Sequence, residues 1–315
     1  MKGPHISRGF LAALVVAVGG VIAQAQSAIR PQMPILKSGT DLVALNVTVQ
    51  DLAGRAATGL VQENFTVFEN GVEQPIALFS DAETPVTWGL VLDRSGSMED
   101  MIGDVHQAAL HAIAEGTPED ESFIVTFNQI PQLVHDFESD RHRLSTALLG
   151  LRASGATALW DAIAFTLGHA RQGRHQKKVL VVLTDGEDNQ SGFAFRELID
   201  FAEREEVLIY TVGMVESGGI LSRFRSRPAW LGDLETLSNV TGARAHFPRS
   251  LEECRNTMKE IAREVAHQYI VGYYPRDLAR DGRWRSLKVV VKAQPGRPDI
   301  TARTRLGYYA PRPLG

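Results

Sequence analysis

Three polar segments of the sequence carry oxygen-bearing side chains that could bind a metal ion. "DRSGS" begins at Asp93 after an apolar run, "GATALWD" lies in the middle of the chain, and "TDGEDN" follows the apolar run "VLVVL". Their carboxylate and hydroxyl oxygens, with no imidazole or thiolate among them, are typical ligands of Mg²⁺, Mn²⁺ or Ca²⁺ rather than of zinc or copper. We therefore predict a divalent cation, Mg²⁺ first with Mn²⁺ or Ca²⁺ as alternatives, held by Asp93, Ser95, Ser97, Thr157 and Asp185.

The spacing of the first segment supports this chemistry. In an extended turn, residues two positions apart can point the same way, so Asp93, Ser95 and Ser97 can face one point. Gly96 between the serines relieves crowding of the backbone. The alternative is that the serines cap a following helix by accepting bonds from its free N–H groups.

Two further aspartates are candidates for a supporting role around the ion. Asp161 follows Thr157 by one helical turn, with a position along the helix surface as the alternative. Asp188 lies in the segment after Asp185, with exposure to solvent as the alternative, and Asp185 followed by glycine is also compatible with a simple turn.

The elements that must position these residues follow from the pattern of apolar runs. "TWGLVLD", "ESFIVTF", "KKVLVVLTD" and "EVLIYTVGM" are almost continuously apolar and alternate with helical patterns, which is typical of a doubly wound, mostly parallel α/β sheet. Ligands of such sheets bind at the carboxyl ends of the strands, where Asp93 and Asp185 are expected. We predict an edge strand at "ARAHF" and helices over residues 102–115, 141–149, 159–171, 193–204, 229–239 and 251–267.

Short alternating patterns flank the α/β region on both sides. Residues 39–85 contain "LVALNVTVQD" and a hairpin signal at Asn70-Gly71, and residues 268–315 contain "SLKVVVKA". Neither segment has enough strands to bury a face alone. We predict that they pack together as one small β-sandwich-like unit beside an α/β domain over residues 86–267.

The first residues have the composition of an export signal. Lys2 and Arg8 precede an apolar stretch, and Ala23-Gln24-Ala25 is typical of a cleavage site, so residues 1–25 are predicted as a signal peptide and 26–38 as a linker. The expected mature protein is secreted or periplasmic, with an uncleaved anchor as the alternative. No later segment approaches the about 20 apolar residues of a membrane span.

Composition excludes some classes of partner and site. The 315-residue chain has a formal net charge of −4, so it has no basic field to attract nucleic acid. The single cysteine, Cys254, cannot form a disulfide framework and is expected to be buried in a helix. The nine histidines show no ligand-pair spacing on a helix, so zinc is not expected.

The order of these motifs resembles the von Willebrand factor type A family with its metal-ion-dependent adhesion site. D-x-S-x-S after the first buried strand, a threonine in a glycine-containing loop, and T-D-G after a later strand carry the resemblance, over residues 86–267. The whole layout is also similar to secreted acidobacterial proteins of that superfamily. The resemblance implies that Ser95, Ser97 and Thr157 hold the ion directly or through water, and that Asp93 and Asp185 act largely through water and hydrogen bonds. It also implies the strand order 3-2-1-4-5-6 with one short antiparallel edge strand.

These observations favour a binding protein over an enzyme. The expected function is metal-dependent adhesion, in which an acidic residue of a protein partner completes the coordination of the ion. Arg223, Arg225 and Arg227 are expected near the site, where they could steer an acidic partner, with a solvated loop as the alternative. The alternative functions are an envelope or assembly scaffold stabilised by its metal site, and a metal-dependent hydrolase. The hydrolase has little support, because no G-x-S-x-G elbow is present.

Overall fold

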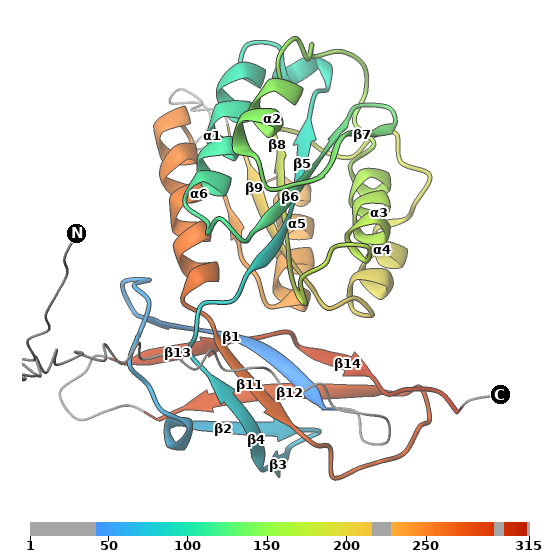
Figure 1. Ribbon diagram of the computed structural model, residues 1–315. Coiled ribbons are helices and arrows are strands. Elements are labelled where there is room, and N and C mark those ends of the chain that lie inside the picture. Colours follow the sequence, from blue (N-terminus) through green and yellow to red (C-terminus); the bar gives the residue numbers. More distant parts are fainter. Residues whose placement is uncertain (1–41, 216–227, 293–298, 314–315) are drawn as a thin grey trace, which may run out of the picture. The chain divides into compact units, whose positions relative to one another are not determined.

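The computed structural model describes residues 42–215, 228–292 and 299–313 (Figure 1). The predicted signal peptide and linker lie outside the described residues. So do Arg223, Arg225 and Arg227, whose expected place near the site is therefore not addressed by the structure.

A six-stranded sheet forms the centre of the α/β domain (Figure 1). Its strand order is β10-β9-β8-β5-β6-β7, and all neighbours are parallel except β6 and β7. Renumbered within the domain, this is the order that the family resemblance implies, with the antiparallel strand at one edge. The strands are β5 (Val86–Asp93), β6 (Glu121–Phe127), β7 (Pro131–Glu138), β8 (Lys177–Thr184), β9 (Val207–Gly213) and β10 (Ala245–His246).

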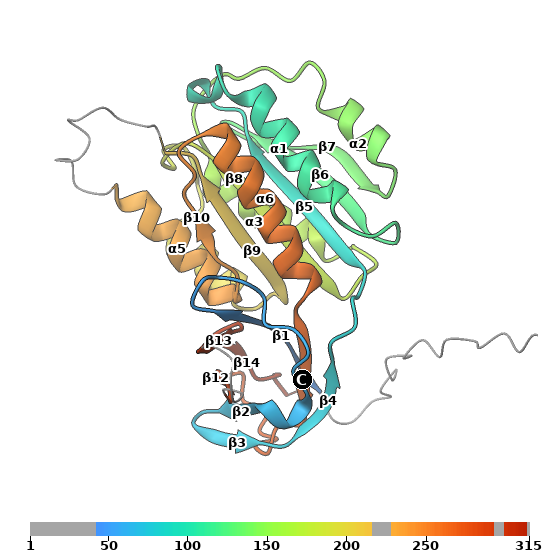
Figure 2. The same ribbon diagram turned by 90° about the vertical axis from the view of Figure 1, so that its left-hand side faces the viewer.

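Helices cover both faces of this sheet (Figure 2), which is why its central strands are apolar on both sides. Every residue of β5, β6 and β9 is buried. One face packs against α1 (Ile102–Ala114), α2 (Arg141–Ala147) and α6 (Leu251–Ala266), the last of which buries Cys254. The other face packs against α3 (Leu159–Ala170), α4 (Phe195–Ala202) and α5 (Ala229–Thr241).

The centre of the sheet requires a glycine at one position. A Cβ atom on Gly89 of β5 would lie 2.4 Å from Leu180 Cδ2 and 2.6 Å from Phe123 Cζ. The two large side chains on the neighbouring strands fill the space above this residue. The position therefore matches the expectation that glycine in a strand marks a close approach.

The strands from the two sides of the α/β domain form a second unit of two four-stranded sheets, as predicted. Their inner faces share one apolar core. One sheet has the order β13-β1-β11-β4, from Ile300–Arg303, Val43–Asp51, Tyr269–Tyr273 and Ile76–Ser80. The other has the order β14-β12-β2-β3, from Gly307–Tyr309, Trp284–Val291, Phe65–Glu69 and Val72–Gln74.

The α/β domain is inserted between two neighbouring strands of this sandwich. The chain leaves the sandwich after β4 and returns at β11, and these strands are antiparallel partners with Ser80 opposite Ile270. The insertion therefore begins and ends at adjacent points of one sheet.

A buried carboxylate joins the last helix of the α/β domain to the sandwich. Glu264 of α6 accepts hydrogen bonds from Tyr210 Oη (2.6 Å) and from Gln50 Nε2 of β1 (2.8 Å). It also forms an ion pair with Arg303 of β13. The α/β domain and the sandwich are thus connected by polar contacts as well as by the chain.

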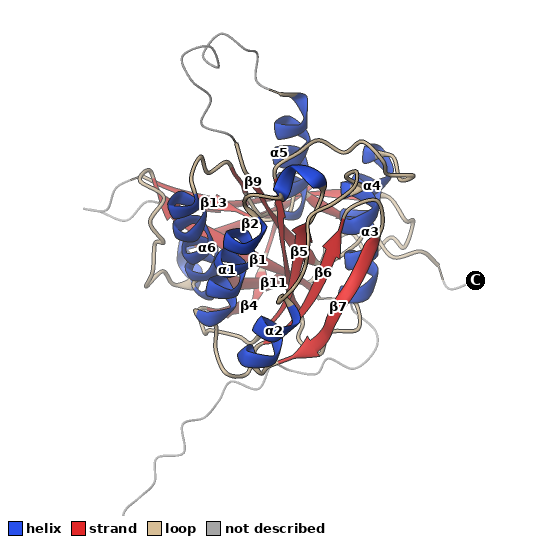
Figure 3. Ribbon diagram, turned by 90° about the horizontal axis from the view of Figure 1, so that it is seen from above, coloured by secondary structure: helices blue, strands red, loops and turns tan. Residues whose placement is uncertain are grey.

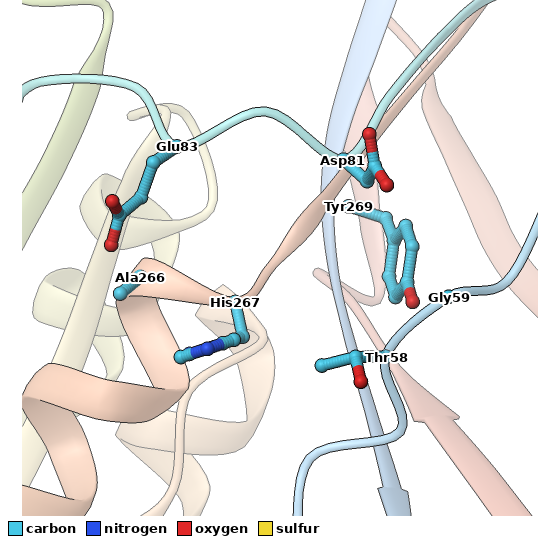
Figure 4. Close-up of a pocket in the computed structure, with 7 residues that line it drawn as sticks. All are labelled: Thr58, Gly59, Asp81, Glu83, Ala266, His267 and Tyr269. Carbon is cyan, nitrogen blue, oxygen red and sulfur yellow. The ribbon is translucent and has the colours of Figure 1, made fainter.

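A pocket of about 290 Å³ lies at the same junction (Figure 4). Asp81 and Glu83 from the connection after β4 line it, together with His267 and Tyr269 where α6 leads into β11. None of the predicted site residues is among its lining residues.

In the described part of the chain, no helix combines the length and the apolar character needed to cross a membrane.

Candidate metal-binding site

The predicted site residues lie in loops at the carboxyl ends of the sheet strands, the end from which Figure 3 views the domain. Asp93 is the last residue of β5, and Asp185 follows the last residue of β8 directly. Because β5 and β8 are parallel neighbours, their ends place both aspartates side by side. Thr157 lies two residues before the first residue of α3.

Four of the predicted ligands form one hydrogen-bonded cluster. Asp93 Oδ1 accepts a bond from the Ser95 N–H (2.7 Å), and the Ser95 and Ser97 hydroxyls lie 3.2 Å apart. Ser97 Oγ in turn donates to Asp185 Oδ1 (2.9 Å). The cluster therefore brings the two predicted carboxylates and both serine hydroxyls to one place.

The alternative role of the serines, as helix caps, is not what the structure shows. Ser95 precedes a short 3₁₀ turn over Gly96–Met98, but its side chain accepts no bond from the N–H groups of that turn. The hydroxyls of Ser95 and Ser97 contact each other and Asp185 instead.

The loop that carries Thr157 is held against the loop that carries the serines. Ser154 N donates to Arg94 O (2.8 Å), and Gly96 N donates to Gly155 O (3.0 Å). Thr157 is 4 % exposed. No hydrogen bond joins its hydroxyl to the other four predicted ligands in the part of the chain that the structure describes, so its contribution rests on the position of its loop.

Asp188 and Asp161 hold the loop after β8 against the beginning of α3. Asp188 Oδ1 accepts from the N–H groups of Leu159 (2.8 Å) and Trp160 (3.4 Å). It thereby caps α3, whose N-cap residue is an alanine without a side-chain acceptor. Asp161, on α3, in turn accepts from two N–H groups of the loop after β8, Gly192 N (3.0 Å) and Phe193 N (2.8 Å). Both aspartates thus support the geometry of the loops around the site.

The electrostatics of Asp93 fit a cation. This carboxylate is fully buried, and its hydrogen-bond partners are the neutral Thr184 hydroxyl (2.6 Å) and Ser95 N–H. Burial raises the pKa of Asp93, the negative charge of Asp185 raises it further, and the hydrogen bonds from Thr184 and Ser95 oppose the rise. Within the described residues no lysine or arginine pairs with Asp93.

A buried carboxylate without a cationic partner is costly, and a bound divalent ion would offset that cost. The described residues contain no group of three or more His, Cys, Asp and Glu side chains that could hold a metal. Any ion at this place would therefore depend on the serine and threonine hydroxyls as well as on the two carboxylates. Such an all-oxygen donor set fits Mg²⁺ and similar hard ions.

Sequence reasoning missed two residues of this region. Thr184 ends β8 as a fully buried hydroxyl and fixes Asp93 through its 2.6 Å bond. Asn189 accepts from Thr157 N (2.9 Å) and donates its own N–H to Thr157 O (3.0 Å). A polar residue at the last position of a buried strand could have indicated Thr184, whereas no local pattern indicates Asn189.

Comparisons with known proteins agree with this fold. Residues 89–187 match the family model of the von Willebrand factor type A domain. The structure of a von Willebrand factor type A protein from Catenulispora acidiphila is similar with a TM-score of 0.51 and 13% identity, over 87% of this chain and 74% of that one. No curated protein matches the chain.

Two solved structures of pilus proteins are similar at lower TM-scores. The von Willebrand factor domain of the type V pili tip protein Mfa5 from Porphyromonas gingivalis has a TM-score of 0.47 and 11% identity, over 58% of this chain and 96% of that one. The PilB minor pilin from Streptococcus sanguinis has the same TM-score and identity, over 60% of this chain, which spans 63% of the pilin chain.

The family match covers β5, β6 and β8 with the loops that carry Asp93, Thr157 and Asp185, and the sheet has the strand order that the resemblance implies. Residues 86–267 therefore have the fold of a von Willebrand factor type A domain.

Proposed function

We propose that the chain is a metal-dependent protein-binding module whose site takes an acidic side chain of a partner. The observation that carries the proposal is the fully buried Asp93, which lies in a cluster of hydroxyls with a second carboxylate nearby and has no cationic partner among the described residues. A divalent ion bound there would supply positive charge and a coordination position for the partner's carboxylate.

The residues of this chain have distinct parts in the proposal. Thr184 and the Ser95 N–H hold the Asp93 carboxylate in one orientation. Ser95, Ser97 and Thr157 supply neutral hydroxyl oxygens, so the site keeps a net attraction for another carboxylate. The proposal includes export of the protein, for which the support is the composition of residues 1–25.

Metal binding is tested first, by calorimetric titration of Mg²⁺ into the wild type and into Asp93→Ala. Asp100→Ala is the matched control, because Asp100 is an exposed aspartate in the same loop region. We expect Mg²⁺ binding in the wild type and in Asp100→Ala, and its loss in Asp93→Ala. Equal Mg²⁺ binding by Asp93→Ala would contradict the proposed site.

Partner chemistry is tested with an array of peptides in which each Glu or Asp peptide has a Gln or Asn counterpart. Binding should require both the carboxylate and Mg²⁺, and EDTA should abolish it. If the wild type binds Mg²⁺ but no peptide pair differs, the metal site stabilises a scaffold and the adhesion function is wrong. Binding that persists in EDTA would exclude the ion from recognition.

A further inference from the structure

The loop after β8 is linked to the Thr157 loop in both directions. Asn189 Oδ1 accepts from Thr157 N at 2.9 Å, and Thr157 O accepts from the N–H groups of Asn189 (3.0 Å) and Gln190 (3.2 Å). The main chain of Thr157 is thus bonded on both its donor and its acceptor side by the loop that carries Asp185.

No regular structure provides these bonds, so they orient Thr157 together with the neighbouring bond from Ala158 N to Asn128 O (2.6 Å). Thr157 lies outside the helix, and α3 begins only at Leu159. Its N–H would lose this partner at a nearly buried position without the Asn189 side chain, and such a loss is costly. Asn189 therefore restricts the main-chain conformation of Thr157 beside the loop that carries Asp185.

We propose that Asn189 is a positioning residue for the metal site, a role that rests on the function proposed above. Asn189 fixes the main chain of Thr157 against the loop that carries Asp185, four residues before Asn189, so that the Thr157 hydroxyl and the Asp185 carboxylate can meet the ion together. Residues that orient metal ligands typically change metal affinity by about 10- to 100-fold when they are replaced. We expect a weakening of Mg²⁺ binding in that range for Asn189→Ala.

The fold should survive the loss of the Asn189 side chain, although the unpaired Thr157 N–H lowers its stability. Asp188 still caps α3 through Leu159, and Asp161 still accepts from Phe193 when Asn189 is shortened. The main-chain bonds from residues 189 and 190 to Thr157 O also remain possible. A purely structural role would therefore lower the melting temperature and leave the metal affinity of the folded protein unchanged, whereas a positioning role lowers that affinity as well.

The experiment compares two neighbouring amides. Asn189→Ala removes the acceptor for Thr157 N. Gln190→Ala is the matched control, because no side-chain hydrogen bond of Gln190 is present in the described residues and its main-chain bond is retained. Asn189→Asp restores an acceptor oxygen but adds a charge, so Gln190→Glu serves as the control for that charge. Each variant is measured by calorimetric Mg²⁺ titration and by its melting temperature in EDTA.

The expected result is weak Mg²⁺ binding by Asn189→Ala alone and recovery in Asn189→Asp beyond any gain in Gln190→Glu. The melting temperature of Asn189→Ala in EDTA falls because the unpaired Thr157 N–H costs about 1–3 kcal/mol, and it recovers together with the affinity in Asn189→Asp. Affinity of Asn189→Ala within about twofold of the wild type would overturn the inference and leave the proposed function standing. Weaker binding accompanied by a lower melting temperature in EDTA, without recovery in Asn189→Asp, would assign Asn189 a structural role. Absence of Mg²⁺ binding by the wild type would overturn the inference and the proposed function together.

Discussion

Replacing Glu264 with glutamine should destabilise the junction between the α/β domain and the sandwich. Its carboxylate accepts bonds from Tyr210 Oη and Gln50 Nε2 and pairs with Arg303. Burial raises the pKa of Tyr210 well above its ordinary value, so this phenol remains a donor at neutral pH. An amide at position 264 cannot accept from all these donors, and it leaves Arg303 without its negative partner.

The size of the expected loss in unfolding free energy follows from how deeply the pair of Glu264 and Arg303 is buried. The side chains of Arg303 and Glu264 are 20% and 7% exposed, and breaking a buried pair costs about 3–5 kcal/mol of unfolding free energy. The lower end applies because Arg303 keeps its bond to Gly242 O (3.0 Å) and some contact with water. A loss of about 3 kcal/mol corresponds to a fall in Tm of roughly 6–12 °C for a domain of this size.

Urea denaturation and scanning calorimetry measure this loss. Glu260→Gln is the matched control, because Glu260 is exposed on the same helix, and it should change the unfolding free energy by less than about 0.5 kcal/mol. The double variant Glu264→Met, Arg303→Met should recover much of the loss, since replacing both partners leaves no unpaired charge. Equal midpoints for Glu264→Gln and Glu260→Gln would refute a stabilising role of the network.

Three further predictions concern the core of the α/β domain, the pH dependence of stability, and the assembly of the sandwich. Gly89→Ala should lower the unfolding free energy, measured by urea denaturation, by about 1–3 kcal/mol, because the added Cβ would overlap Leu180 and Phe123. The control Gly103→Ala places its Cβ in open space on α1 and should not lower it. Burial lowers the pKa of His106 from 6.5 to about 4. The stability due to the neutral ring is therefore fully present above pH 6.5 and is lost as the pH falls toward 4. The unfolding free energy falls by up to about 1.4 kcal/mol per pH unit in this range. His106→Leu should lose that part of the acid destabilisation, and an unchanged pH slope would contradict the assignment. Deleting residues 268–315 removes β11 from between β1 and β4, so hydrogen exchange over residues 43–80 should lose protection; unchanged protection would show that the N-terminal strands fold alone.

The helices and buried strands could be predicted from the sequence because each has a strong pattern of its own. The helix predicted over residues 159–171 is observed as Leu159–Ala170, for example. The family resemblance implied a short antiparallel edge strand, but the residue pattern does not locate β7, which has eight residues. Its side chains are all partly or fully exposed and its first residue is Pro131, so it shows neither a continuous apolar run nor a strict alternation.

The candidate residues could be predicted where polar side chains follow a buried strand, as at Asp93 and Asp185, but the contacts between the loops could not. Asp93, Ser95 and Ser97 lie together in the sequence, whereas the cap that Asp188 provides to Leu159 joins residues 29 positions apart. The bond from Gln50 to Glu264 spans 214 positions, and nothing in the amphipathic pattern of α6 distinguishes Glu264 from its exposed acidic neighbours. Contacts of this kind depend on the assembled fold, which one sequence does not display.

The insertion of the α/β domain between β4 and β11 also determines how the protein would transmit a mechanical load. β1 is hydrogen-bonded to β13, and β14 follows β13 in the chain, so tension between β1 and β14 passes through the sandwich. The inserted domain joins the sandwich through the chain at two adjacent points, Ser80 and Ile270, and through the contacts of Glu264, so this path bypasses it. A protein pulled at β1 and β14 would therefore keep the loops around Asp93 and Asp185 unstretched until β1 separates from its partners.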